Sequence, residues 1–402
     1  MGIHPPIVDK FLVVVIRMSD IRVLYDYQAF TMQTHGGVSR CFMELYKHLP
    51  EGVKAQIAIK ESDNVYIRDI EGVKPAHDRY NKFVCPHNFW GKGHLHLWYD
   101  KLTHGGYYPN YNKTYSIELL RKGDFDVFHP TFFSDYFLPY LNGKPFVLTI
   151  HDMIPELYPQ YFANDNIQIV MKRKLAPLAN AIVAVSDNTK KDIVEILHVP
   201  EEKVHVVYHG CSFPYNSDKI IPMSVPYILY VGDRYGYKNF DLFVQYVTPF
   251  LKSDHETYVV CTGKPFKKEE KELFAKYNVE AKFVHYWVST DEEFFSLYHQ
   301  ALCFVYTSEY EGFGIPILEA YQADCPVLLN RASCFPEIAG DAAIYFEMDS
   351  NSSDIVDKLE CIYSMSTEER HVLLKKQRER LALYSWDKSA MKLVEVYKSI
   401  LQ

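Results

Sequence analysis

Two glutamates, Glu311 and Glu319, stand on either side of a Gly-Phe-Gly turn in the stretch "SEYEGFGIPILEA". Carboxylates accept hydrogen bonds and do not donate them, so both side chains are suited to binding hydroxyl groups. Pro316 favours a helix that begins after the turn, and Gly312 and Gly314 let backbone amides approach an anion at the positive end of that helix. Two acids beside a phosphate cradle predict a site for a sugar nucleotide.

Two cations, Arg234 and Lys238, follow the apolar run "YILYVGD". Cations just beyond the end of a strand can hold a diphosphate and stabilise the charge that grows on it as a leaving group. Taken alone, the same pattern also fits ion pairs with acids on the protein surface.

Two further segments combine chemistry-bearing residues with a strand end. His151 closes the run "PFVLTIHD", where it either contacts a ligand or is a structural histidine bonded to Asp152 or to backbone. Gly36 and Gly37 in "THGGVSR" either make a strand-to-helix turn or allow close approach of a phosphate. Ser186 is expected to cap a helix.

Short apolar runs that end in small or polar residues recur along the chain and alternate with helical periodicity. They are the run from Ile21, residues 55–60, 126–132, 145–152 and 181–187, and then residues 227–233, 257–263, 281–287, 302–308, 325–330 and 342–347. Parallel strands covered on both faces have this pattern, and their carboxyl ends are where such sheets bind ligands. A chain of 402 residues exceeds one ordinary core, so two α/β domains are expected, with a linker between Val207 and Pro226.

The regions between and after these runs give weaker signals. Residues 62–120 are rich in aromatic side chains and fit either a packed surface insertion or a loop on the acceptor side. The charge run at 267–271 predicts a solvated helix face. The C-terminal segment predicts two helices, with Ser385 or Asp387 as the cap of the second.

The composition limits the classes of function. A hydrophobic content of 48% with 23% charged residues is typical of a globular protein, and the net charge of -8 gives no basic footprint for nucleic acid. Eight cysteines without a Cys-x-x-Cys pair indicate a reducing compartment. His94 and His96 would share one face of a strand, but no third metal ligand stands near them. Residues 11–16 are too short an apolar run to span a bilayer.

Taken together, eight motifs in order resemble the retaining glycosyltransferases of family 4, which adopt the GT-B fold. The motifs are "HGGVSR", "TIHD", "AIVAVSDNTKKDI", "VHVVYHG", "YVGDRYGYKN", "YEGFGIPILEA", "PVLLNRASCFPEIAGDAA" and "YSWDKSA". The resemblance covers nearly all of the chain from Ile21. It implies an α/β fold of two Rossmann-like domains that face a central cleft, with a C-terminal helix crossing back to the first domain.

The resulting expected boundaries are as follows: residues 1–17 form an extension outside the fold, 18–215 the acceptor-side domain, 216–384 the nucleotide-sugar domain and 385–402 the crossing helix.

In such enzymes the second acid of the motif, here Glu319, binds the ribose hydroxyls of the donor, and the first, here Glu311, contacts the transferred sugar. The backbone of Gly312, Phe313 and Gly314 faces the sugar and the distal phosphate. From the residue type alone, Phe313 also fits pure packing, and Glu337 further along is expected to be structural.

The resemblance also assigns roles to the cations and to the first domain. Arg234 and Lys238 match the pair that neutralises the diphosphate leaving group. His151 matches a histidine at the reaction centre that contacts the donor sugar. Gly36 and Gly37 match the loop that approaches the donor phosphate when the domains close.

The resemblance implies transfer of a sugar from a nucleotide-sugar donor to an acceptor hydroxyl with retention, without a cofactor or a metal ion. The segment "HDMIPELYP" resembles members that use GDP-mannose, while UDP-sugars serve on the same scaffold. A saccharide or lipid-linked saccharide acceptor and a cytoplasmic location with peripheral contact at the inner membrane face are expected. Two other readings stay open, namely a GT-B-fold sugar-nucleotide epimerase and a non-catalytic sugar-nucleotide-binding protein.

Overall fold

The computed structural model describes residues 20–402 except 77–86, 88–89, 93, 96–97, 99–110, 163–165, 214–224 and 254. The predictions for residues 1–17, for His96 and for most of the linker therefore lie outside the described residues. At His94 the strand interpretation is wrong, because the neighbouring Leu95 N–H bonds to Gly91 O at 2.9 Å, which is a helical contact. In the described part of the chain, no helix combines the length and the apolar run that crossing a bilayer requires.

The first domain is built on parallel strands in two groups, ordered β2-β1-β3 and β4-β5-β6. The strands are β1 (Ile21–Tyr25), β2 (Val53–Ile57), β3 (Val127–His129), β4 (Val147–Ile150), β5 (Ala181–Ala184) and β6 (Val204–Val206). A single parallel bridge between Phe128 and Phe146 joins the two groups at β3 and β4. All the carboxyl ends of these strands therefore point to the same edge.

The second domain has one parallel sheet with the order β12-β11-β10-β7-β8-β9. Its strands are β7 (Tyr227–Tyr230), β8 (Tyr258–Cys261), β9 (Phe283–His285), β10 (Cys303–Tyr306), β11 (Val327–Asn330) and β12 (Ile344–Phe346). The chain moves outward from β7 to β9, returns to the other side of β7 and moves outward again to β12. The order reverses between β7 and β10, and doubly wound sheets bind ligands at such a switch point.

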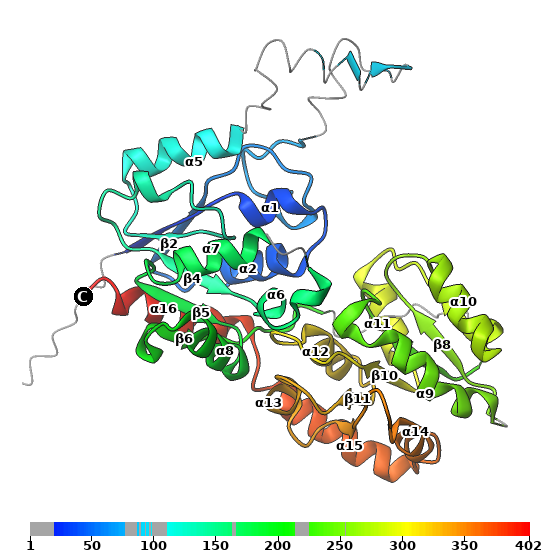
Figure 1. Cartoon of the computed structure of the whole chain (residues 1–402). Coiled ribbons are helices and arrows are strands. Elements are labelled where there is room, and N and C mark those ends of the chain that lie inside the picture. The colour runs from blue at the N-terminus through cyan, green and yellow to red at the C-terminus, as the bar shows by residue number, and fades with distance from the viewer. Residues whose placement is uncertain are drawn as a thin grey trace, which may run out of the picture.

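Helices cover the sheets, and Figure 1 shows the two domains as separate layered bodies that meet near α6 and α12. The helices of the first domain are α1 (Gln28–Met32), α2 (Gly37–Lys47), α5 (Tyr111–Lys122), α6 (Ile154–Leu157), α7 (Ile167–Leu175) and α8 (Asp187–Leu197). Those that follow are α9 (Phe240–Lys252), α10 (Lys268–Tyr277), α11 (Asp291–His299), α12 (Ile315–Gln322), α13 (Phe335–Ala339), α14 (Ile355–Tyr363), α15 (Thr367–Leu381) and α16 (Trp386–Ser399). Strands β4, β5, β7, β10 and β11 are buried at every position, as their unbroken apolar runs predict.

The last helix crosses back to the first domain, as expected. In Figure 1, α15 lies on the second domain and α16 lies against the sheet of the first. Tyr397 on α16 places its hydroxyl 2.8 Å from both the Tyr25 hydroxyl and His129 Nδ1, inside the first core. The predicted cap is confirmed, because the Ser385 hydroxyl accepts a hydrogen bond from Lys388 N at 3.3 Å.

The charge run at 267–271 is not a fully solvated face, so that prediction is wrong at Glu270. This residue is buried, because its carboxylate accepts a hydrogen bond from Lys267 N at 2.6 Å at the start of α10 and also pairs with Arg234. The hydrogen bond at the start of the helix and the ion pair with arginine both satisfy the carboxylate, so it can be buried.

Candidate active site between the two domains

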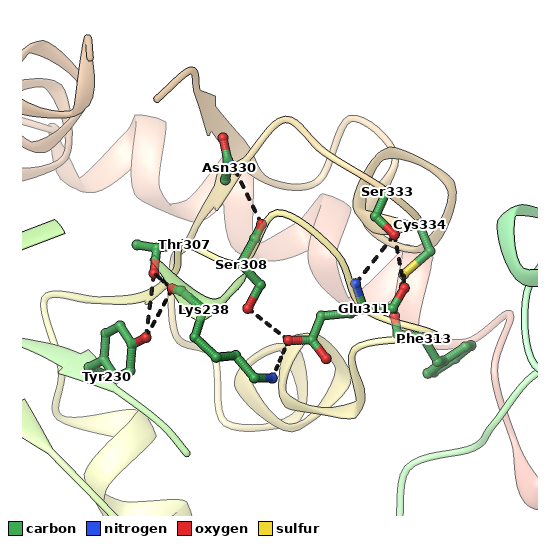
Figure 2. A network of polar contacts seen from close by, with 9 residues as sticks. All are labelled: Tyr230, Lys238, Thr307, Ser308, Glu311, Phe313, Asn330, Ser333 and Cys334. Carbon is green, nitrogen blue, oxygen red and sulfur yellow. Dashed lines mark hydrogen bonds and ion pairs between the residues drawn. The ribbon is translucent and has the colours of Figure 1, made fainter. Parts of the chain in front are cut away.

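The switch point of the second sheet holds an ion pair between Lys238 and Glu311. Lys238 ends the short 3₁₀ turn that follows β7, and Glu311 lies in the loop between β10 and α12. Lys238 Nζ contacts Glu311 Oε1, and the Ser308 hydroxyl donates to the same oxygen at 2.7 Å (Figure 2). The structure thus brings together a cation and an acid that stand far apart in the sequence.

Hydrogen bonds to backbone hold the two loops in register. The Thr307 hydroxyl donates to Lys238 O at 2.6 Å and the Tyr230 hydroxyl donates to the same oxygen at 3.2 Å. On the other loop, the Ser333 hydroxyl donates to Glu311 O at 2.9 Å (Figure 2). Because the side chains of the ion pair stand on a fixed backbone, they are positioned before any ligand arrives.

The glycines between the two acids bring the second domain into contact with the first. Gly314 has a φ of +90° and is the N-cap of α12, which begins at Ile315 and has Pro316 in its first turn. At Gly312 a Cβ atom would lie 1.7 Å from His151 O, so only glycine fits. Ser186 Oγ and Thr189 Oγ1 of the first domain donate to Gly312 O at 2.6 and 3.1 Å.

The same contact brings His151 to the loop that carries Glu311. His151 follows β4, and its Nε2 atom is buried and has no hydrogen-bond partner among the residues that the structure describes. Burial is the main cause that lowers the pKa of His151 to about 4; the charge of Asp152 opposes this effect and the charge of Lys172 adds to it. The imidazole is therefore neutral at neutral pH and keeps one nitrogen for a ligand.

Glu319 lies on α12 and is buried, 5% exposed. Its Oε1 is 3.1 Å from Nη1 of Arg40, which belongs to α2 of the first domain, and its Oε2 accepts a hydrogen bond from the Tyr298 hydroxyl at 3.2 Å. Burial raises the pKa of Glu319, and the Arg40 charge and the Tyr298 hydrogen bond oppose that rise. A carboxylate with two oxygens has further acceptor positions that these two contacts leave for hydroxyls.

Arg40 is a residue that the sequence interpretation missed. It stands in "HGGVSR", three positions after Gly37, where only the glycines drew attention. Gly36 is the N-cap of α2, and the Arg40 N–H bonds to Gly36 O at 3.0 Å. The first turn of α2 therefore faces the second domain, with the predicted glycine loop at its start.

Arg234 is held differently from Lys238. Its guanidinium donates to Glu270 Oε1 at 2.7 Å, to Thr262 O at 2.8 Å and to Lys264 O at 2.5 Å, and the side chain is 4% exposed. These contacts use three of the five N–H groups and offset the charge. The role of Arg234 at a diphosphate stays a prediction, and it would rest on the two N–H groups that remain.

Phe313 and Glu337 also join the domains. The Phe313 ring is buried, and its centroid is 4.9 Å from that of His209 in the first domain, so the side chain packs as the simpler interpretation had it. Glu337 accepts hydrogen bonds from Asp187 N at 2.7 Å and Asn188 N at 3.0 Å, at the start of α8. The expectation that Glu337 is structural is confirmed, although its partners lie in the other domain.

Two family models match consecutive parts of the chain. "Glycosyltransferase Family 4" matches residues 35–212, and "Glycosyl transferases group 1" matches residues 215–380. Among curated proteins, the O-antigen chain mannosyltransferase B of Escherichia coli is 25% identical over 285 residues, which cover 66% of this chain and 72% of the relative. The O-antigen chain mannosyltransferase RfbU of Salmonella typhimurium is 28% identical over 221 residues, 54% of this chain and 60% of the relative.

Solved structures agree in fold. A glycosyltransferase from Rickettsia africae has a TM-score of 0.67 at 18% identity, covering 95% of this chain and 99% of its own. Anabaena Alr3699/HepE in complex with UDP and glucose has a TM-score of 0.67 at 14% identity, covering 94% and 100%. Two matched models that together span both domains, on a doubly wound GT-B architecture, show that this chain belongs to the group 1 glycosyltransferases of family 4.

Proposed function

We propose that this glycosyltransferase moves a mannosyl group from GDP-mannose to the hydroxyl of a saccharide acceptor in polysaccharide biosynthesis, with retention of the anomeric configuration. The observation that carries the proposal is the Lys238–Glu311 pair at the switch point, with the neutral His151 directly across the Gly312 contact. The cation suits the phosphate of a sugar nucleotide, and the carboxylate and the neutral imidazole suit its hydroxyl groups.

The choice of donor rests on the relatives. Those named above are O-antigen mannosyltransferases, and an MMP alpha-(1->4)-mannosyltransferase from Mycolicibacterium hassiacum is 23% identical over 310 residues. The Anabaena protein, which matches in fold alone, binds UDP-glucose. We therefore give GDP-mannose first place and UDP-sugars second.

Each residue then has a physical task. As the bond between sugar and phosphate breaks, negative charge grows on the diphosphate, so Lys238 and the amides at the start of α12 stabilise the transition state more than the ground state. Glu319 accepts from the ribose hydroxyls and Arg40 fixes its orientation through the 3.1 Å ion pair. His151 uses its unpartnered Nε2 on a hydroxyl of the sugar.

Retention follows in this proposal from attack on the same face that the phosphate leaves, with the departing phosphate taking the proton of the acceptor hydroxyl. No side chain is named as nucleophile, because Glu311 is already bound to Lys238 and Ser308. Stabilisation of the phosphate by side chains and amides requires no divalent metal. Transfer should therefore proceed at the same rate in EDTA.

A lipid-linked saccharide acceptor would bring the protein to the cytoplasmic face of a membrane. Helix α7 and the residues after it expose the apolar side chains of Ile167, Val170 and Leu178 beside the exposed Arg173. An apolar surface with a basic neighbour suits a layer of anionic lipid. Sedimentation with vesicles of phosphatidylglycerol should weaken for Ile167→Glu/Val170→Glu and stay unchanged for Met391→Glu, an exposed position on α16.

The experiment that tests the function supplies radiolabelled GDP-mannose, with UDP-glucose in parallel, to purified protein with an O-antigen-type oligosaccharide. Label in the oligosaccharide supports transfer, and nuclear magnetic resonance of the product reports the anomeric configuration. Free or rearranged sugar without an acceptor would point to an epimerase. Binding without turnover of either donor would point to a non-catalytic protein.

A further inference from the structure

A cysteine and two histidines of the first domain converge beside the proposed active site. Cys41 lies on α2, His151 follows β4, and His209 follows β6. One ligand atom from each of them lies within 4.8 Å of the other two, and Cys41 Sγ is 3.4 Å from His209 Nδ1. The two imidazoles stack with their centroids 5.9 Å apart.

The donor set and spacing suit a soft divalent cation. A tetrahedral zinc ion has Zn–S distances of about 2.3 Å and Zn–N distances of about 2.0–2.1 Å, which places neighbouring ligand atoms roughly 3.3–3.6 Å apart. The separation of Cys41 Sγ and His209 Nδ1 already falls in that range. The other ligand atoms lie within 4.8 Å of one another, so they must approach by at most about 1.5 Å to reach this spacing.

Two imidazoles and a thiol are ligand types that zinc takes in proteins. Cys41 Sγ and His209 Nδ1 share a hydrogen bond, so an incoming cation must displace the proton between them. Within the described part of the chain His151 Nε2 is buried without a hydrogen-bond partner, which is a second sign that this position takes a ligand.

We propose that Cys41, His151 and His209 form a binding site for Zn²⁺ or a similar soft cation, and that the bound ion inhibits the enzyme reversibly. The thiol proton leaves to solvent, the thiolate and two imidazoles coordinate the ion, and no electron is transferred. Cys41 and His209 are buried while His151 is partly exposed, so His151 is the member of the three that is most accessible from solvent. The inhibition rests on the proposed function, because it requires His151 to contact the donor sugar.

Metal binding is tested without any reaction. Co²⁺ is added to the chelator-free protein and the thiolate-to-cobalt absorption is recorded, with Zn²⁺ titrated in to displace the cobalt. One ion per chain is expected with the thiolate band present. The band should disappear in Cys41→Ser and His209→Gln and persist in Cys361→Ser, the exposed cysteine on α14. A band that survives in Cys41→Ser, or no band in the native protein, would overturn the site.

Inhibition is then measured separately. Zn²⁺ should weaken binding of the nucleotide sugar while leaving binding of the free nucleotide unchanged, and EDTA should reverse the effect. In Cys41→Ser, the Zn²⁺ concentration for half inhibition should rise at least tenfold. If the ion binds and transfer continues undiminished, the regulatory part is refuted. If no donor is turned over at all, the cobalt spectra still decide the metal site, so the two failures are distinguishable.

Discussion

Replacing Gly312 by alanine should break the contact on which the active site is assembled. The new Cβ would lie 1.7 Å from His151 O, and real Cβ atoms essentially never approach a heavy atom closer than 3.0 Å, so one backbone must move by at least 1.3 Å, the difference between these values. Neither atom belongs to a flexible side-chain end, so the strain cannot be relieved by a rotamer change. The loop of the second domain and the end of β4 must separate.

The cost can be estimated from the contacts. Overpacking of this kind costs roughly 1–3 kcal/mol. The hydrogen bonds from Ser186 and Thr189 to Gly312 O contribute about 1 kcal/mol each, and the displacement weakens both. We therefore expect the free energy of unfolding to fall by roughly 3–5 kcal/mol in the arrangement in which Gly312 contacts His151. A shift of about 1 Å between reacting groups also lowers turnover by roughly a hundredfold.

The assay combines urea unfolding with steady-state kinetics on Gly312→Ala. Gly37→Ala is the matched control for stability, because no heavy atom lies within 4 Å of its added Cβ and the residue begins α2. Alanine is favoured over glycine in a helix by up to about 1 kcal/mol, so the control should be neutral or stabilising. A Gly312→Ala protein with native stability and native turnover would refute the close contact between the domains.

Three further predictions follow from single interactions. Lys238→Met should lower kcat by about 10²–10³ and also weaken binding of free GDP, as stopped-assay kinetics and calorimetry would report, because the cation acts on the leaving diphosphate and free GDP carries that charge in full; an unchanged kcat would contradict this role. Arg40→Gln should weaken nucleotide binding tenfold or more in the otherwise native protein. In a protein that already carries Glu319→Gln it should cause no further loss, since Arg40 acts through Glu319. Additive losses of affinity in this double-mutant cycle would contradict that coupling. The free energy of unfolding should fall as the pH drops below 6.5, because burial holds the pKa of both His129 and His209 at about 3 in the folded protein, whereas both take up a proton in the unfolded chain. Each histidine should lower the free energy of unfolding by about 1.4 kcal/mol per pH unit. A free energy of unfolding that stays constant from pH 6.5 to 5 in urea titrations would be incompatible with this burial.

The strands and the core of the site were predictable because they are encoded locally. Apolar runs that end in polar residues marked the sheets, and the spacing of "EGFGIPILEA" indicated the glycine loop and the start of α12. Lys238 and Glu311 follow strands β7 and β10, which the doubly wound order makes neighbours at the switch point. Their meeting therefore follows from pattern and topology together.

The partners across the domain interface were not predictable in this way. Arg40 and Glu319 stand 279 positions apart, and nothing in the sequence around the arginine indicates which acid it contacts. Arg234 is a cation after a strand, as a phosphate ligand would be. Its contact with Glu270 was not predictable, because it depends on the position that Glu270 takes at the start of α10. No pattern in the sequence marked Cys41 as a neighbour of His151 and His209, because these residues lie far apart along the chain.

The most direct test of the account measures binding of GDP-mannose by calorimetry to the native protein and to Glu319→Gln. The account places the ribose hydroxyls on Glu319, and hydrogen bonds to a charged group contribute about 1.5–3 kcal/mol each. The predicted result is a Kd at least tenfold weaker in the variant, measured under conditions in which circular dichroism shows both proteins to be folded, because the change also breaks the buried pair with Arg40. Equal affinity in the two proteins would contradict the assignment of Glu319, and with it the donor site proposed between the two domains.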